Sequence, residues 1–566
     1  MRFLALAADY DGTLASHGSV DQPTLDALQR FTESGRKLVI VTGRQLDDLQ
    51  TVFPHLELFS RVVAENGALL YDPRSKSQRM LAEPPNPAFV EELRRRGVPV
   101  STGNAIVATW HPHEKTVLDV IREHGLELQV IFNKGAVMVL PSSINKGTGL
   151  KCALDELGLS IHNSIGVGDA ENDHAFLAQC ECSVAVANAL DSLKNRADVV
   201  TDRAHGAGVA EVIEQVLKDD LQSWAPRLVR HNILLGHDQN GHEVTIPPYG
   251  SSVLIAGPSG SGKSSVLTGI LERLLSAEYQ ICLIDPEGDF DDLQGVVTVG
   301  DAEHPPVLRE VLSLVGKFQN PVVNLLGVRL PDRPGFFSTL LPQLQELRVH
   351  TGRPHWLVID EAHHLLPENW QPAHITMPQQ LHSAIYVTVH PDHVSRAALQ
   401  SVGVVLAVGR DPLQTMAAFA DRASATSPDQ GSRIELNKSE TLAWFRETNE
   451  LMILQIEPSK GERRRHRRKY AEGDIQEKSF YFRGPEGKLN LRAQNLAIFV
   501  QMAEGVDEAT WVHHLRQHDY SRWVRIAIKD ERLAHEVEAI EDEDPDPTSS
   551  RRRIIDAIER QYTSAA

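Results

Sequence analysis

The amino-acid sequence predicts an α/β protein in which at least two domains are built on parallel sheets. Two stretches carry this prediction. The apolar run 252–256 leads into a glycine-rich turn and then into residues 265–275, whose apolar spacing is helical. The apolar run 3–8 ends directly at two carboxylates, Asp9 and Asp11. Open α/β sheets place their functional groups at the carboxyl ends of strands, so both stretches indicate chemical sites.

Composition limits the classes of protein that fit. A chain of 566 residues, 41% of them hydrophobic, is long enough for several domains with sizeable cores. The net charge of −19 argues against general binding of polyanions, so any contact with nucleic acid has to be local or inside a ring channel. The four cysteines do not form a disulfide scaffold and favour a reducing, cytoplasmic location. No apolar run is long enough for a membrane span, and the apolar start reaches Asp9 too soon for a signal peptide.

The first unit, residues 1–218, contains four chemical motifs in order. Asp9 and Asp11 suit phosphoryl transfer, because one carboxylate can act as nucleophile and Mg²⁺ ligand while the other protonates the leaving group. The strand-like run 37–41 leads to Thr42, whose hydroxyl can hold a phosphate oxygen. Lys146 precedes a predicted helix. The strand-like run 165–168 leads to an acidic cluster that begins at Asp169 and suits Mg²⁺.

Taken together, these motifs resemble those of the haloacid dehalogenase (HAD) phosphatase superfamily. The stretches 65–68 and 205–211 resemble its Cof-type branch, which includes sugar-phosphate and phosphoglycolate phosphatases. The resemblance implies that Asp9 forms an aspartyl phosphate, that Asp11 is the acid and base, and that Thr42 and Lys146 hold the phosphoryl group. The metal-binding residues it implies are Asp9, Asp11, Asp169 and Asp173, with support from Asn172.

The segment between Thr42 and Lys146 has its own alternation of helix and strand. Helical spacing at 87–94 and 113–122 alternates with strand-like runs at 105–110, 128–131 and 136–140. This pattern resembles the small α+β cap of Cof-type members, which closes over the site and selects the substrate. The expected division is a Rossmann-like HAD core at 1–83 and 142–218, with the cap at 84–141.

The second unit, residues 230–455, is organised around a P-loop. Residues 257–264 match the pattern G-x-x-x-x-G-K-[ST], with a strand before them and a helix after them. The motif predicts that backbone N–H groups cradle phosphates, that Lys263 reaches the β- and γ-phosphates of ATP, and that Ser264 binds Mg²⁺. Downstream, Asp360 is expected to hold the Mg²⁺ shell and Glu361 to orient the attacking water. The predicted nucleotide-binding residues are Gly257, Gly260, Gly262, Lys263, Ser264 and Ser265.

The combination of this P-loop with residues 285–289 and 360–363 resembles the HerA/FtsK group of ring-forming ATPases, which have a RecA-like fold. The resemblance implies a homo-oligomer, most often a hexamer, that moves nucleic acid or protein. Arg410 is the candidate for an arginine that completes a neighbouring site, although a surface arginine is the simpler interpretation. Members often carry glutamine as the phosphate sensor, whereas this chain offers Thr388 or His390.

The remaining region, 456–566, is expected to be helical. Residues 462–470 form a basic run that, with the aromatic residues at 480–482, either holds phosphates and stacks bases or is a solvated helix face or a salt-bridged contact between domains. Residues 489–502 and 507–528 have helical apolar spacing, and the acidic stretch 536–550 suggests a linker.

Three functional hypotheses follow. The first is a Mg²⁺-dependent phosphatase fused to a ring ATPase that acts on nucleic acid. The second is a phosphatase for a small sugar phosphate or phosphoglycolate-type substrate, with a regulatory nucleotide-binding domain. The third, an end-processing phosphatase and kinase, is weakened by Glu361, because a water-activating carboxylate is typical of hydrolysis.

Overall fold

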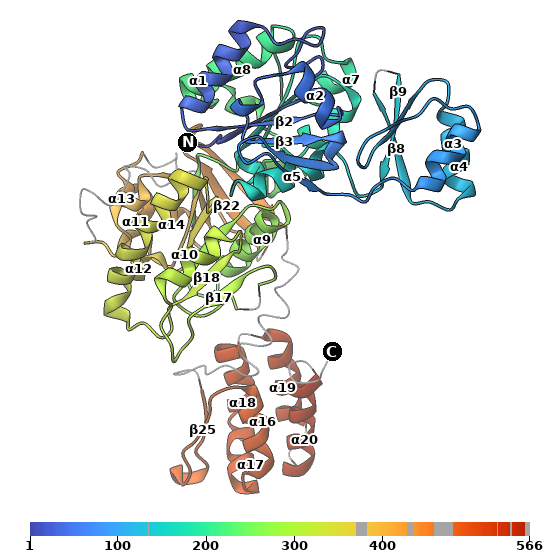
Figure 1. Cartoon of the computed structure of the whole chain (residues 1–566). Coiled ribbons are helices and arrows are strands. Elements are labelled where there is room, and N and C mark those ends of the chain that lie inside the picture. The colour runs from blue at the N-terminus through green and yellow to red at the C-terminus, as the bar shows by residue number, and fades with distance from the viewer. Residues whose placement is uncertain are drawn as a thin grey trace.

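The computed structural model describes residues 1–560 except 134, 292, 370–381, 427–433, 438, 458–478, 529 and 544–545. Figure 1 shows an N-terminal unit with a smaller sheet beside it, a second α/β unit, and a helical C-terminal unit. In these described ranges, every helix is too short or too polar to cross a bilayer.

The N-terminal unit is built on an eight-stranded sheet in the order β12-β11-β10-β1-β2-β3-β4-β5. The strands from β12 to β3 are parallel, and β4 and β5 extend the edge as an antiparallel hairpin. The strand bounds are β1 Ala5–Ala8, β2 Lys37–Val41, β3 Arg61–Ala64, β4 Leu69–Asp72, β5 Ser77–Met80, β10 Ser164–Gly168, β11 Cys182–Ala185 and β12 Val199–Val200.

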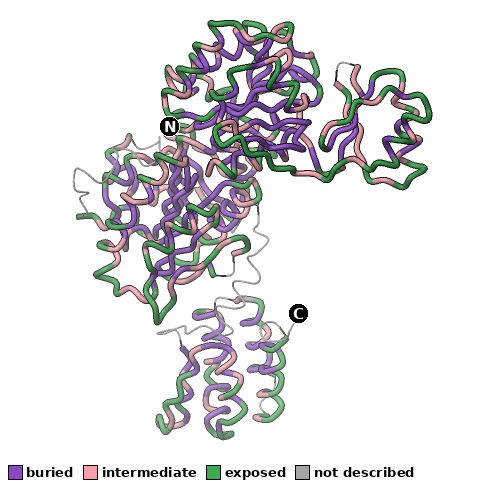
Figure 2. Tube along the Cα trace, viewed as in Figure 1, coloured by how far each residue is buried: buried purple, intermediate pink, exposed green. Residues whose placement is uncertain are grey.

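Helices cover this sheet and bury its central strands. α1 and α8 pack together, whereas α5 contacts β2, β3 and β4 (Figure 1). Every residue of β1 is buried, which explains its uninterrupted apolar sequence. Figure 2 shows the buried residues concentrated along the strands. The helices are α1 Gln22–Glu33, α2 Leu46–Val52, α5 Lys146–Glu156, α6 His174–Leu177, α7 Asp191–Lys194 and α8 His205–Asp219.

A smaller unit is inserted between β5 and α5. Its four-stranded antiparallel sheet has the order β6-β7-β9-β8 and packs α3 and α4 around a core of its own. The elements are α3 Pro87–Arg95, β6 Ser101–Thr102, β7 Val107–Trp110, α4 Glu114–Glu123, β8 Leu128–Asn133 and β9 Ala136–Pro141.

The second unit has an eleven-stranded sheet in the order β14-β13-β23-β22-β21-β15-β20-β19-β16-β18-β17. The strands from β21 to β17 are parallel, and one strand, β20, separates β15 from β19. The strands are β13 Ile233–His237, β14 Glu243–Ile246, β15 Ser252–Ala256, β16 Ile281–Asp285, β17 Val297–Val299, β18 Pro321–Asn324, β19 Trp356–Ile359, β20 Ala384–Thr388, β21 Val402–Ala407, β22 Glu440–Phe445 and β23 Glu450–Ile456.

Two apolar clusters fill the two faces of this sheet. One includes side chains of α9, and the other includes side chains of α10, α11 and α14. The helices are α9 Lys263–Ser276, α10 Leu308–Gly316, α11 Arg333–Thr351, α12 Ala362–Leu365, α13 Arg396–Leu399 and α14 Pro412–Ala423.

The C-terminal unit has a separate aromatic-rich core. Its elements are β24 Phe480–Phe482, β25 Leu491–Ala493, α16 Leu496–Gly505, α17 Glu508–Arg516, α18 Asp519–Trp523, α19 Glu531–Glu543 and α20 Pro547–Ile558. Two expectations are wrong here. Residues 491–493 pair with β24 instead of joining a helix. The stretch 536–550 contains the end of α19 and the start of α20, where a linker was expected. The basic run 462–470 lies outside the described residues.

Candidate functional site

The first site forms where three strands and one helix of the N-terminal sheet end or begin together. Asp9 follows β1, Thr42 follows β2, Asp169 follows β10, and Lys146 is the first residue of α5. The pairing of β1 with both β2 and β10 sets these strand ends side by side, since parallel neighbours share one carboxyl edge.

Lys146 lies at the centre of this site. Its Nζ donates to Oδ1 of Asp9 and to Oδ1 of Asp173, each at 2.6 Å. The other oxygen of Asp173 accepts the backbone N–H of Asp169 at 2.8 Å. All four side chains are buried, so their positions are fixed by these contacts and by the surrounding core.

The site carries more negative than positive charge. Carboxylate oxygens of Asp9, Asp169 and Asp173 lie within 4.8 Å of one another, and Lys146 is their cationic partner. Burial is the largest influence on Asp9 and raises its pKa to about 8, with Asp173 and Asp169 adding to the shift and Lys146 opposing it. A divalent cation bound by oxygen ligands would relieve this excess charge, so the residues fit Mg²⁺.

Asp11 has a different surrounding. Its two oxygens accept from Nε and Nη2 of Arg44 at 2.6 and 2.7 Å, a bidentate ion pair. The Asp11 side chain is 43% exposed, so it is open to a ligand above the sheet edge.

Thr42 is buried, and its Oγ1 accepts the backbone N–H of Arg44. Asn172 donates to Asn66 at 2.9 Å.

Two residues in this region were not assigned roles from the sequence. Arg44 holds Asp11, as described above. Glu65 is fully buried, and its carboxylate accepts from the backbone N–H groups of Asn104, Ala105 and Ile106 at 2.9–3.2 Å. Glu65 therefore joins the sheet carrying the site to the inserted unit. In the sequence, both residues closely follow expected strands, and Glu65 begins the stretch 65–68 that resembles the Cof-type branch, but neither observation gives a role.

The second site surrounds the glycine-rich turn between β15 and α9. Gly257, Gly260 and Gly262 all have φ between 76° and 154°, a region that L side chains rarely adopt. Lys263 begins α9, and its Nζ donates to the carbonyls of Gly257 and Pro258 at 3.0 and 3.1 Å. Ser264 and Ser265 follow in the first turn of α9; Ser264 is exposed and Ser265 is half-buried.

Carboxylates lie at the carboxyl ends of β16 and β19, which belong to the same sheet as β15. Asp360 follows β19 and is buried, and burial, then Asp285 and Glu361, raises its pKa well above the ordinary value. Glu361 has a φ of 42°, which costs a non-glycine residue conformational energy. The carboxylates of Asp285, Asp360 and Glu361 thus influence one another at the carboxyl edge of the sheet to which the glycine-rich turn also belongs.

A polar chain links these carboxylates to β20. Oε2 of Glu361 lies 3.4 Å from Nδ1 of His363, and that nitrogen lies 3.1 Å from Oγ1 of Thr388. His390 donates its backbone N–H to the same hydroxyl at 3.1 Å. Of the two candidate sensors, Thr388 is the one whose side chain hydrogen-bonds to His363, the histidine next to Glu361. Arg410 is exposed, after the end of β21.

Comparison with known proteins concerns the N-terminal part. A family model described as haloacid dehalogenase-like hydrolase matches residues 6–94 and 114–213. A phosphoglycolate phosphatase of Methanothermobacter thermautotrophicus is 29% identical over 223 residues, which cover 38% of this chain and 98% of the relative. Phosphoglycolate phosphatase 2 of Saccharolobus solfataricus is 27% identical over 219 residues, covering 38% and 92%. A solved haloacid dehalogenase-like hydrolase from Bacteroides thetaiotaomicron has 21% identity and a TM-score of 0.34, covering 38% of this chain and 99% of that one. The family matches confirm the expected superfamily for the N-terminal unit.

Proposed function

Because the N-terminal unit is a haloacid dehalogenase-like hydrolase domain, we propose that it hydrolyses a phosphate monoester through a covalent aspartyl phosphate. The observation that carries the proposal is Lys146, which places its ammonium 2.6 Å from Asp9 inside a cluster of buried carboxylates. Lys146 opposes the rise in the pKa of Asp9 that burial causes, and its charge would neutralise an incoming phosphoryl group.

The residues divide the reaction between them. An Asp9 oxygen attacks phosphorus as the bond to the leaving oxygen breaks, and Asp11 gives that oxygen a proton. Asp11 then takes a proton from the water that attacks the phosphoryl-aspartate, which releases phosphate and restores Asp9. Thr42 and Lys146 hold the phosphoryl oxygens. Asp9, Asp169 and Asp173 would hold Mg²⁺, which supplies further neutralisation of phosphoryl charge.

We expect the Asp11 side chain to take two positions during the reaction. In this structure Asp11 is bound to Arg44, so we expect its carboxyl to turn toward the leaving group when substrate enters. The inserted unit, attached through Glu65, is the element we expect to close over the substrate and exclude water.

The proposed substrate is small. The relatives in the comparison are named phosphoglycolate phosphatases, and a sugar phosphate is the alternative. A screen of phosphoglycolate, sugar phosphates and 5′-phosphorylated DNA ends separates a metabolic role from an end-processing one, by the substrate with the highest kcat/KM.

The test of the chemistry is Asp9→Asn, which keeps the shape of the side chain and removes its nucleophilic charge. Turnover of p-nitrophenyl phosphate with Mg²⁺ should fall by at least about 10³-fold. Asp26→Asn, on the exposed side of α1, is the matched control and should keep normal turnover. Near wild-type turnover of Asp9→Asn would contradict the covalent mechanism.

A second candidate function belongs to the P-loop unit: ATP hydrolysis with Mg²⁺. The observation that favours it is Lys263 at the start of α9, in a sheet whose carboxyl edge also carries Asp360 and Glu361. Ser264 and Asp360 would hold Mg²⁺, Glu361 would orient water, and the backbone of Gly257, Gly260, Gly262 and Ser265 would cradle the phosphates.

Lys263→Ala tests this function. The variant should lose ATP hydrolysis, because the contact with the β- and γ-phosphates is gone, and should keep phosphatase turnover. ATP turnover that persists in Lys263→Ala would contradict the assignment.

The assembly and partner of the P-loop unit form a further part of this proposal. A ring, most simply a hexamer, would let Arg410 reach a neighbouring site, and stimulation of ATP turnover by DNA would indicate a nucleic-acid partner. A protein that binds ATP without turnover would instead favour a regulatory nucleotide-binding role. Light scattering and turnover measured across protein concentrations distinguish these outcomes.

A further inference from the structure

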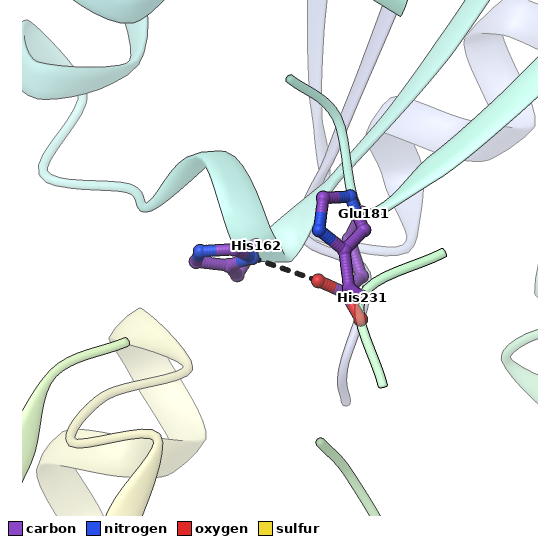
Figure 3. A group of neighbouring side chains, drawn as sticks. All are labelled: His162, Glu181 and His231. Carbon is purple, nitrogen blue, oxygen red and sulfur yellow. Dashed lines mark hydrogen bonds and ion pairs between the residues drawn. The ribbon is translucent and has the colours of Figure 1, made fainter. Parts of the chain in front are cut away.

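A second group of metal-binding side chains lies away from both sites, at the junction between the first two units. His162 precedes β10, Glu181 precedes β11, and His231 lies two residues before β13. Figure 3 shows the three side chains converging from separate segments. One ligand atom from each lies within 4.8 Å of the other two. The chemistry assigned to the active sites uses none of the three.

Hydrogen bonds fix the orientation of both imidazoles. Nε2 of His162 lies 2.7 Å from the carbonyl oxygen of Ala277, and Nε2 of His231 lies 3.0 Å from that of Cys180. A carbonyl only accepts, so each Nε2 carries the proton and donates it. Each ring then has Nδ1 as its second nitrogen. A histidine that binds a metal usually donates its other N–H to a carbonyl or carboxylate in this way.

Hydrogen bonds and an ion pair also fix the orientation of the Glu181 carboxylate. Oε2 of Glu181 lies 2.8 Å from Nδ1 of His162 and accepts the hydroxyl of Tyr279 at 2.8 Å, and Arg2 binds Oε1. Burial opposes ionisation of Glu181, but the hydrogen bond from His162 and the charge of Arg2 outweigh it and lower its pKa to about 2. Glu181 is therefore an ionised ligand with partners that orient it.

We propose that His162, Glu181 and His231 bind a divalent transition-metal ion, with zinc as the best match. Two imidazoles and one carboxylate form a ligand set that zinc takes in proteins, with water in the fourth position. Magnesium is excluded by its preference for oxygen ligands. A cavity of about 340 Å³ lined by His162, His231 and Glu278 opens beside the cluster and has room for that water.

Metal binding rearranges one contact of the cluster. Nδ1 of His162 lies 2.8 Å from Oε2 of Glu181, and an ion bound between them would take the place of this hydrogen bond.

The position of the site suggests its role. His162 contacts Ala277, which directly follows α9, and Glu181 contacts Tyr279, so both ligands already touch the second unit. His231 belongs to the segment that joins the units. A metal here would fasten the connecting segment to the first unit and fix the junction. This inference is independent of the phosphatase and ATPase proposals.

The experiment measures zinc binding to the full chain. Protein stripped with a chelator is dialysed into excess Mg²⁺, which occupies the carboxylate site, and is then titrated with ZnCl₂. We expect one zinc ion to be retained per chain in elemental analysis. Co²⁺ in place of zinc should give the intense visible absorption of a tetrahedral site with nitrogen ligands.

Variants separate this site from other binding. His231→Gln keeps a donor for the carbonyl of Cys180 but lacks the imidazole, and it should lose the tight zinc ion and the Co²⁺ absorption. The matched control His124→Ala, an exposed histidine after α4, should keep both, and so should Asp169→Asn. Zinc should raise the melting temperature of the wild type and leave that of His231→Gln unchanged. Stoichiometric zinc in His231→Gln, or none in a folded wild type, would overturn the proposal.

Discussion

Lys146 is the residue on which the first site depends most. Lys146→Met leaves Asp9 and Asp173 buried without their cation, so the variant should be about 3–5 kcal/mol less stable in the absence of Mg²⁺. Added Mg²⁺ should recover part of that loss but not the phosphatase turnover. Urea denaturation with and without Mg²⁺ measures the effect.

Lys151→Met is the control for this prediction. Lys151 lies on the same helix, α5, but its side chain is 48% exposed and pairs with Glu278 at the surface. An exposed pair contributes at most about 1 kcal/mol, so Lys151→Met should have little effect. Equal losses in the two variants would show that the buried position of Lys146 has no special energetic role.

The position of a single residue can be predicted from the sequence when that residue directly follows a strand. Asp9, Thr42 and Asp169 all follow parallel strands of one sheet, and such strand ends necessarily lie along the same edge. Glu65 could not be assigned, because its role depends on how the inserted unit docks. Its partners at residues 104–106 belong to a loop of that unit, and no local pattern specifies the contact.

Among the elements, α5 shows how a helix start positions a chemical group. Asn145 caps α5 by accepting from the N–H groups of Gly147 and Thr148 at 2.9 and 3.0 Å, next to Lys146. Asn145→Ala should cost about 1 kcal/mol of stability and also lower kcat, because the first turn of α5 loosens.

Asn86→Ala is the matched control, since Asn86 caps α3 of the inserted unit by accepting from Ala88 at 2.9 Å. It should cost a similar amount of stability and leave kcat closer to normal. Denaturation curves and p-nitrophenyl phosphate turnover test both variants. A kcat that is unchanged in Asn145→Ala would separate the cap from the chemistry.

Element prediction worked where apolar periodicity was long and clear and failed in the C-terminal unit. Leu491–Ala493 has apolar spacing that a helix also allows, but its pairing with Phe480–Phe482 makes it a strand, and Asn495 starts the helix only afterwards. The acidic composition of 536–550 suggested a linker, but this stretch includes parts of two amphipathic helices. Asp546 caps the second of them. Charge density alone therefore does not identify a linker.

On the scale of the whole molecule, the core clusters indicate independent units. The buried cluster around Phe480, Trp511 and Ile558 contains only residues of the C-terminal unit. Removal of residues 458–566 should therefore leave Mg²⁺-dependent phosphatase turnover within about twofold of the full chain. If DNA stimulates ATP turnover through the basic run 462–470, the same truncation should abolish that stimulation. A truncated protein that aggregates or loses phosphatase activity would show that the units share stability.

The central position of β1 has a consequence for how the chain is made. Ala5 pairs with Lys37 on one side and with Ser164 on the other, and the backbone of Phe3 meets the carboxylate of Asp220. At a synthesis rate of roughly 5–20 residues per second, β10 leaves the ribosome on the order of ten seconds after β1. Until then, β1 cannot pair along the edge that β10 later occupies. The inserted unit, with a core of its own, has all its residues before then. Asp9 is thus translated well before the rest of its site, which is complete only after Asp173 has emerged.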